Sequence, residues 1–254
     1  MTLSTAMAIS GAAANPWAAS AGVGLTRNRL IGTLMALMNL RLGYWVPNPR
    51  EKDNDNAVKR PTVNHFRPGL DEVIGRNLTE ASSLCLLSDG GHFENLALYE
   101  LIRRRVRLIL LCDGTADPNY DFSDLQNAMF RIGEDFGATI QFPKDKGELT
   151  PFMPALDAGY PHTALLSPQA YAVAEIRYAD GAEGKLIYIN TALIKGLKLE
   201  LLGYKCANWD FPDQSTGDQF FDEAQFRAYQ ELGYAIAETM IENERREGGA
   251  LTLL

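Results

Sequence analysis

Three short apolar runs alternating with two amphipathic stretches constrain the fold of this chain more than any other feature of its sequence. The apolar runs have the length of strands, and the stretches between them carry apolar residues along one helical face. In chain order, these predicted strands and helices are Ser83–Leu87, Asn95–Arg104, Val106–Cys112, Asp124–Phe136 and Ala138–Phe142. The alternation predicts an α/β fold with a central, mainly parallel sheet flanked by helices.

The segments on either side extend this prediction. Thr26–Leu40 has the apolar spacing of a helix, and Glu51–Pro61 is a charged, asparagine-rich stretch typical of an exposed loop. Ala172–Tyr178 and Lys185–Asn190 predict a β-hairpin, and Glu223–Arg245 predicts a long helix. Because no internal repeat or clear linker interrupts the chain, we expect a single α/β domain over residues 1–254.

The charge of the chain argues against a nucleic-acid partner. The chain has a net charge of −8, with 46% hydrophobic and 22% charged residues, which is an ordinary globular composition. Its longest basic run is Arg103-Arg104-Arg105. A nucleic-acid-binding surface needs a more concentrated basic face.

The cysteines and histidines do not form the pattern of a metal site or a disulfide framework. The three cysteines, Cys85, Cys112 and Cys206, are odd in number and outside any Cys-x-x-Cys spacing, and the first two lie in predicted strands. We interpret them as small core residues in a reducing compartment. The three histidines are not spaced as ligands, so we expect no metal.

The amino-terminal region does not resemble a targeting or membrane-spanning segment. Met1–Ala21 lacks a charged start before an apolar stretch, and Leu30–Leu42 is too short to cross a bilayer. We therefore expect a cytoplasmic protein. The chain begins in core-like sequence, which predicts that a further segment belongs in front of it.

The strongest candidate for chemistry is Asp89, in the turn Asp89-Gly90-Gly91 between a predicted strand and a predicted helix. Side chains that follow the carboxyl ends of strands line the sites of α/β proteins. The two glycines leave room above the carboxylate. The alternative interpretation is a tight turn with a capping aspartate.

The residues around this turn resemble a known family. The stretch Leu86-Leu87-Ser88-Asp89-Gly90-Gly91-His92-Phe93-Glu94-Asn95-Leu96 resembles the catalytic-aspartate turn of patatin-like acyl hydrolases, which include the cytosolic phospholipases. Two further segments, Ala8–Pro16 and Ser215–Phe221, resemble bacterial members more loosely. The resemblance implies a patatin-like fold, with residues 171–254 as a family-specific carboxy-terminal extension.

The resemblance also implies a reaction. Asp89 would be the base of a Ser–Asp dyad that hydrolyses a lipid acyl ester, with backbone amides stabilising the oxyanion. Such a reaction requires no metal or organic cofactor. A membrane surface is a possible partner through the full-length protein.

The chain departs from the family pattern at the nucleophile. No serine in the chain has the Gly-x-Ser-x-Gly surroundings of a nucleophile elbow, and no glycine-rich oxyanion loop is present. We therefore expect a fold incomplete at the amino terminus, with the serine in a missing amino-terminal half or a complementary chain. The isolated chain should be inactive. The alternative function is a non-catalytic lipid- or protein-binding module.

Several other residues are candidates for the lining of the site. Ser10 is flanked by Ala8 and Ala12 and is expected to shape the site rather than to replace the nucleophile. His92 either lines the pocket, binds a phosphate or is an exposed turn residue. Asn95 is expected to cap the next helix and Glu94 to be solvated. An aromatic-rich neighbourhood near the first helix predicts an acyl-chain wall, a membrane-facing patch or, preferentially, core: Trp17, Leu42, Tyr44, Trp45 and Val46.

Overall fold

A computed structural model describes residues 2–10, 43–48, 81–144, 147–156, 165–215 and 220–246. The chain divides into two compact units, Met1–Asn95 and Leu96–Leu254, which are described separately. The helix predicted at Thr26–Leu40 and the loop predicted at Glu51–Pro61 lie outside the described residues. The expectation of a single domain stays a prediction.

The first unit contains a short antiparallel ribbon. Its described elements are α1 (Leu3–Ser10), β1 (Tyr44–Pro47), β2 (Leu84–Leu87) and the 3₁₀ turn η4 (Gly90–His92). Strands β1 and β2 pair antiparallel, with Trp45 opposite Leu86. The predicted strand at Ser83–Leu87 is therefore present. It pairs with β1 instead of joining the sheet that contains the other predicted strands.

The second unit is built on a four-stranded mixed sheet. Its strands are β3 (Leu108–Asp113), β4 (Thr139–Gln141), β7 (Tyr171–Arg177) and β8 (Glu183–Asn190), in the order β3-β8-β7-β4. Only β3 and β8 are parallel, while β7 pairs antiparallel with both β8 and β4. The prediction of a mainly parallel sheet was wrong, because the β7–β8 hairpin lies between β3 and β4.

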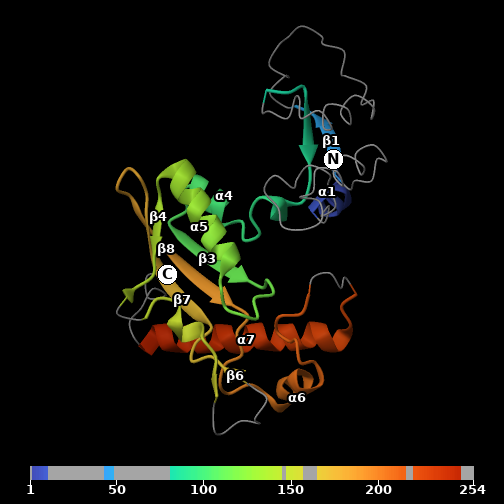
Figure 1. Ribbon diagram of the computed structural model, residues 1–254, viewed down its shortest axis with the longest axis vertical. Coiled ribbons are helices and arrows are strands. Elements are labelled where there is room, and N and C mark those ends of the chain that lie inside the picture. Colours follow the sequence, from blue (N-terminus) through green and yellow to red (C-terminus); the bar gives the residue numbers. More distant parts are fainter. Residues whose placement is uncertain are drawn as a thin grey trace. The chain divides into compact units, whose positions relative to one another are not determined.

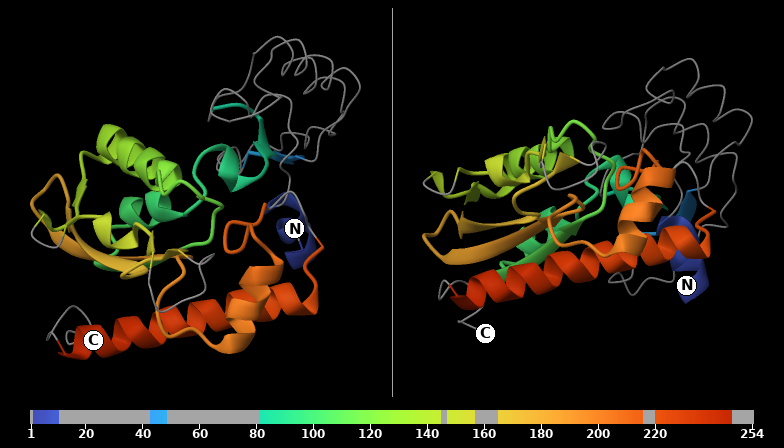
Figure 2. Two further views of the ribbon diagram at one scale, coloured as in Figure 1. Left: turned by 60° about the horizontal axis from the view of Figure 1, so that its bottom comes forward. Right: turned by 90° about the horizontal axis from the view of Figure 1, so that it is seen from below.

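Helices cover both faces of this sheet (Figures 1 and 2). Helices α4 (Leu98–Arg103) and α5 (Ser123–Phe136) pack on one face, where Leu98, Ile102, Leu125 and Ile132 meet apolar residues of the strands. Helix α7 (Glu223–Arg246) crosses the other face through Met240. The coarse prediction of a sheet between helices is confirmed for this unit.

A second core lies beside the sheet, between α6 (Leu199–Ala207) and α7. Phe211, Leu232 and Ile236 are buried in it. The long helix predicted at Glu223–Arg245 is present as α7, and it buries Leu232 and Ile236 while Phe226 is 62% exposed. The remaining elements of this unit are short: η6 (Thr150–Phe152), β5 (Ala155–Leu156) and β6 (Leu165–Leu166).

Strand β3 has one buried and one open face. Ile109 and Leu111 point into the core under α4 and α5, whereas Leu110 is 56% exposed and Cys112 is exposed. The prediction that Cys112 is a core residue was therefore wrong. An entirely apolar strand does not reveal from its sequence which of its faces is covered.

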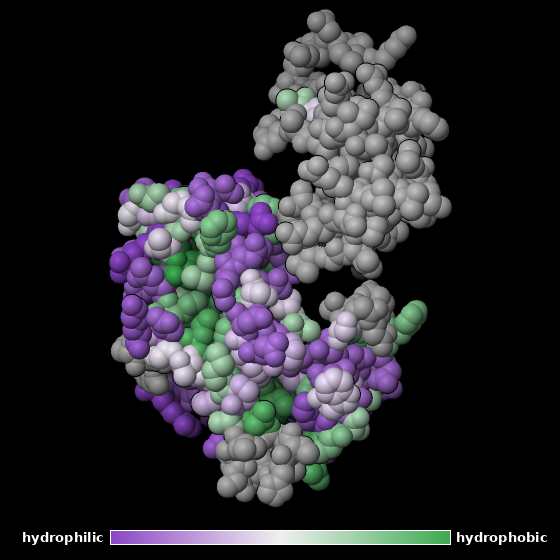
Figure 3. Space-filling view, viewed as in Figure 1, coloured by the Kyte–Doolittle hydropathy of each residue, from purple (hydrophilic) through white to green (hydrophobic). Residues whose placement is uncertain are grey.

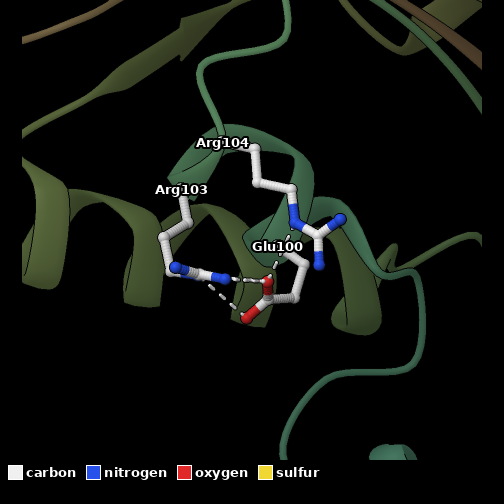
Figure 4. A network of polar contacts seen from close by, with 3 residues as sticks. All are labelled: Glu100, Arg103 and Arg104. Atoms are coloured by element: carbon white, nitrogen blue, oxygen red, sulfur yellow. Dashed lines mark hydrogen bonds and ion pairs between the residues drawn. The ribbon is translucent and has the colours of Figure 1, made fainter.

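The surface of the second unit is mixed in character. Figure 3 shows apolar side chains in the middle of one face of this unit, with polar side chains around them. On α4, the Glu100 carboxylate lies between two guanidinium groups, 2.8 Å from Arg103 Nη2 and 3.6 Å from Arg104 Nε (Figure 4). Arg105 pairs with Asp180. Each arginine of the basic run thus has an acidic partner, and because these pairs are exposed they contribute little to stability.

Candidate functional site

Asp89 begins a 3₁₀ turn directly after the ribbon strand β2. The strand ends at Leu87, and Asp89 is the N-terminal capping residue of η4. Its Oδ1 accepts a hydrogen bond from the backbone N–H of Gly91 at 2.9 Å. The side chain is half-buried. The carboxylate is therefore held at a strand end by its own turn, as the strand–Asp-Gly-Gly order predicts; that it faces an open groove stays a prediction.

Gly91 is closely packed against side chains of its own turn. A Cβ atom on Gly91 would lie 2.4 Å from Oδ1 of Asn95 and 3.3 Å from Oδ1 of Asp89. By contrast, a Cβ atom on Gly90 would meet no atom within 4 Å. The glycine-rich turn thus brings the Asp89 carboxylate and the Asn95 amide, six residues apart along the chain, to the same backbone position.

Two predictions for the residues after the turn were wrong. Asn95 does not cap the following helix, because α4 begins at Leu98 and its N-cap is Ala97, which has no side-chain capping bond. The Asn95 side chain instead lies against Gly91. Glu94 was expected to be solvated, but it is only 9% exposed.

The side chains of Ser10 and His92 lie outside the described residues. Ser10 is the last residue of α1, and His92 is the last residue of η4. The roles predicted for them, a site-shaping serine and a pocket-lining or phosphate-binding histidine, stay predictions.

The second unit contains a buried polar cluster that the sequence did not reveal. Asp113 ends β3 and Asn190 ends β8, and the two residues are register partners on these parallel strands. The Tyr188 hydroxyl donates to Asp113 Oδ2 at 2.8 Å, and Asn190 Nδ2 donates to the Tyr188 oxygen at 3.3 Å. Thr115 donates to Asp113 Oδ1 through its N–H at 3.0 Å and its hydroxyl at 2.7 Å.

These bonds assign Asp113 a structural role. The carboxylate is buried and accepts three hydrogen bonds, so its lone pairs are already engaged. Burial, and then the neighbouring Asp113 carboxylate, raise the pKa of Tyr188 far above its ordinary range. Tyr188 therefore remains a donor. The one sequence signal for this cluster was Asp113-Gly114, a second strand-to-turn aspartate.

A further aspartate pair joins the segment after β3 to the segment after α6. The Asp117 carboxylate accepts from the N–H groups of Asp121 at 3.0 Å and Phe122 at 2.8 Å. The N–H of Asp117 itself donates to Asp213 Oδ1 at 2.9 Å. These bonds order the loop at the carboxyl end of β3, which is the end of the sheet where α/β proteins place their sites.

Comparison with known proteins adds no relative. No protein-family model matches the chain, and neither a curated protein nor a solved structure matches it. The patatin-like assignment therefore stays a prediction from the aspartate turn. In the part of the chain that the structure describes, no helix combines the length and apolar character needed to cross a membrane.

Proposed function

We propose that this chain supplies the catalytic aspartate, Asp89, of a patatin-like lipid acyl-ester hydrolase. The observation that carries the proposal is the geometry of the Asp89 turn. Its carboxylate accepts a hydrogen bond from the Gly91 N–H, and a Cβ atom at position 91 would displace the Asn95 side chain and press on the carboxylate. A general base needs such a fixed position to reach the proton that it removes.

The reaction assigns a proton-transfer role to Asp89. A serine hydroxyl attacks the ester carbonyl carbon while Asp89 takes its proton, and that proton then passes to the departing alcohol. Water next attacks the acyl-serine carbonyl carbon and gives a proton to Asp89. The acyl–serine bond then breaks, Asp89 returns this proton to the serine oxygen, and the fatty acid is released. The chain lacks a Gly-x-Ser-x-Gly elbow, so the serine must come from outside it. No step requires a metal or an organic cofactor.

The proposal includes a partner and a setting. The segment with the serine and the oxyanion amides is either another part of the full-length protein or a complementary chain. The assembly would act in the cytoplasm on lipid at a membrane surface. The competing proposal, a non-catalytic module with Asp89 as a structural turn residue, predicts the same fold without turnover.

The test is to recover the tagged chain with its partners from the cells that produce it. We expect the assembly to hydrolyse a p-nitrophenyl acyl ester and to react with a fluorophosphonate probe at a serine outside this chain. Asp89→Asn should lower turnover by about 10³-fold or more while the partners are retained. The matched control is Asp180→Asn, in the exposed β7–β8 turn, which should retain activity.

Two outcomes would contradict the proposal. Full turnover by the Asp89→Asn assembly would remove Asp89 from the reaction. An assembly without probe-reactive serine and without turnover, which still binds lipid regardless of residue 89, would favour the binding module.

A further inference from the structure

A cavity of about 310 Å³ lies within the second unit, between the segment after β3 and the segment after α6. This volume is at the lower end of the range for small-ligand sites. Proline and leucine side chains form its apolar wall, including Pro212 and Leu193. Its polar lining includes Tyr120, Lys205 and Asp213. The cavity therefore combines an apolar wall with groups of both charges.

Asp213 brings a carboxylate that is only partly satisfied. Its Oδ1 accepts from the Asp117 N–H at 2.9 Å, whereas Oδ2 accepts no hydrogen bond from the described residues. Burial raises the pKa of this carboxyl above its ordinary value, opposed by the bond from Asp117. A half-buried carboxylate with one uncommitted oxygen would be stabilised by a cation in the cavity.

Lys205 brings an ammonium group that is fixed in place. It donates to the backbone carbonyl oxygens of Trp209, at 2.7 Å, and of Phe211. Burial lowers its pKa, although Asp213 and Asp210 act in the opposite direction. No ion pair joins Lys205 to Asp213 among the described residues, although both line the cavity. The third N–H of Lys205 is therefore available to an anion.

Trp209 supplies an aromatic surface beside these charges. It lines the cavity, yet its side chain is 86% exposed. An indole face attracts a cation, and alkylated ammonium groups suit such a face because they need no hydrogen-bond acceptor. The Tyr120 hydroxyl, which is hydrogen-bonded with Ser167, adds a neutral polar group to the same lining.

We propose that this cavity binds a small zwitterion, an ammonium joined to a phosphate as in phosphocholine. Its cation would lie against Asp213 and Trp209, and its anion against Lys205 and Tyr120. The lining carries one ammonium, Lys205, and two carboxylates, Asp210 and Asp213. A cation alone would leave Lys205 without a counter-charge and an anion alone would be repelled by the carboxylates, whereas a zwitterion meets charges of both signs. This proposal does not depend on Asp89, because it concerns binding and not turnover.

The first experiment is calorimetric titration of the full chain with phosphocholine, choline and inorganic phosphate. We expect saturable binding of phosphocholine, at least tenfold tighter than that of either fragment. Asp213→Asn and Trp209→Ala should each weaken it about tenfold or more. Asp180→Asn, outside the cavity, should leave it unchanged. Unfolding midpoints would establish that the variants are folded, and Trp209→Ala removes an exposed side chain that is not part of the core.

A second experiment distinguishes a free ligand from a lipid head group. Vesicles of phosphatidylcholine and of phosphatidylglycerol are sedimented with the chain. If phosphatidylcholine vesicles capture the chain and free phosphocholine releases it, the ligand is a lipid head group. If the chain binds phosphocholine but the vesicles do not capture it, the ligand is a free metabolite. Both results support the site. Absence of phosphocholine binding, equal affinity for choline or phosphate alone, or unchanged affinity in Asp213→Asn would overturn it.

Discussion

Tyr188 donates its hydroxyl hydrogen to Oδ2 of Asp113 at 2.8 Å, and this bond links residues that are 75 positions apart in the sequence. Tyr188 lies two residues before the end of the register between β8 and β3, and Asp113 is the last residue of β3. The bond therefore joins the carboxyl-terminal ends of β3 and β8, which are the only parallel pair of strands in the described sheet.

Tyr188→Phe should destabilise the second unit by about 1–3 kcal/mol. The substitution leaves a buried carboxylate oxygen of Asp113 without its donor, and the cost of an unsatisfied buried acceptor exceeds the net value of a typical hydrogen bond. Urea unfolding measures the effect. The matched control is Tyr234→Phe, because Tyr234 is exposed on α7, and it should change stability by less than about 0.5 kcal/mol. If Tyr188→Phe and Tyr234→Phe were equally stable, the hydrogen bond from Tyr188 to Asp113 would not stabilise the fold.

Gly91→Ala should disrupt the aspartate turn, whereas Gly90→Ala should be tolerated. Only the first substitution places a Cβ atom against Asn95. We expect Gly91→Ala to cost about 1–3 kcal/mol, as overpacking does elsewhere. Asn95→Ala should relieve most of this cost in the double variant. Hydrogen exchange of the turn amides would report the change. Loss of protection in both single glycine variants would show that a general feature of the turn, and not Asn95, is responsible.

Asp213→Asn should change the pH dependence of stability. Burial raises the pKa of Asp213 above its ordinary value of 3.8, so the folded protein binds this proton more tightly than the unfolded chain. The protonated Asp213 carboxyl therefore contributes stability at pH values below 3.8. This contribution to the free energy of unfolding is lost as the pH rises through the raised pKa of the folded protein. The nearby groups that also act on it are Lys205 and Asp117.

The asparagine keeps an oxygen for the Asp117 N–H but cannot ionise. Relative to wild type, the variant should therefore gain stability in urea unfolding as the pH rises above 3.8. Asp180→Asn should show the opposite trend, because Arg105 lowers the pKa of Asp180. If the difference in stability between Asp213→Asn and wild type did not change with pH, the burial of the Asp213 charge would have no energetic consequence.

The purified chain alone should not hydrolyse a p-nitrophenyl ester above background. It contains no Gly-x-Ser-x-Gly elbow, and loss of a nucleophile leaves only a small residual rate. The assay compares the unmodified chain with Asp89→Asn and Ser10→Ala. Turnover abolished by both substitutions would identify Ser10 as the nucleophile of a complete dyad.

The sequence predicted local elements better than their pairing. The stripe of α5 and the Asp180-Gly181 hairpin depend on neighbouring residues, and both are present. The pairing of β2 with β1 depends on residues about 40 positions apart, which no local pattern encodes.

The same limit applies to the candidate sites. The strand-to-turn position of Asp89 was readable because strand, glycines and aspartate are contiguous. The role of Asn95 was missed because an asparagine before a helix resembles a cap, while its contact with Gly91 depends on the shape of the turn. The partners of Asp213 come from a segment 96 residues away, so nothing near it in the sequence pointed to a cavity.

The position of β8 between β3 and β7 has a consequence for the order in which the chain acquires its structure. The partner of β3 is β8, which is synthesised about 70 residues later, whereas β7 and β8 are joined by a short turn. Local hairpins close in microseconds, and long-range pairings are slower because they must first overcome the entropy of a large loop. During translation, the apolar strand Leu108–Asp113 therefore emerges well before its partner. In that interval the apolar side chains that β3 buries in the finished sheet are exposed to solvent and to aggregation.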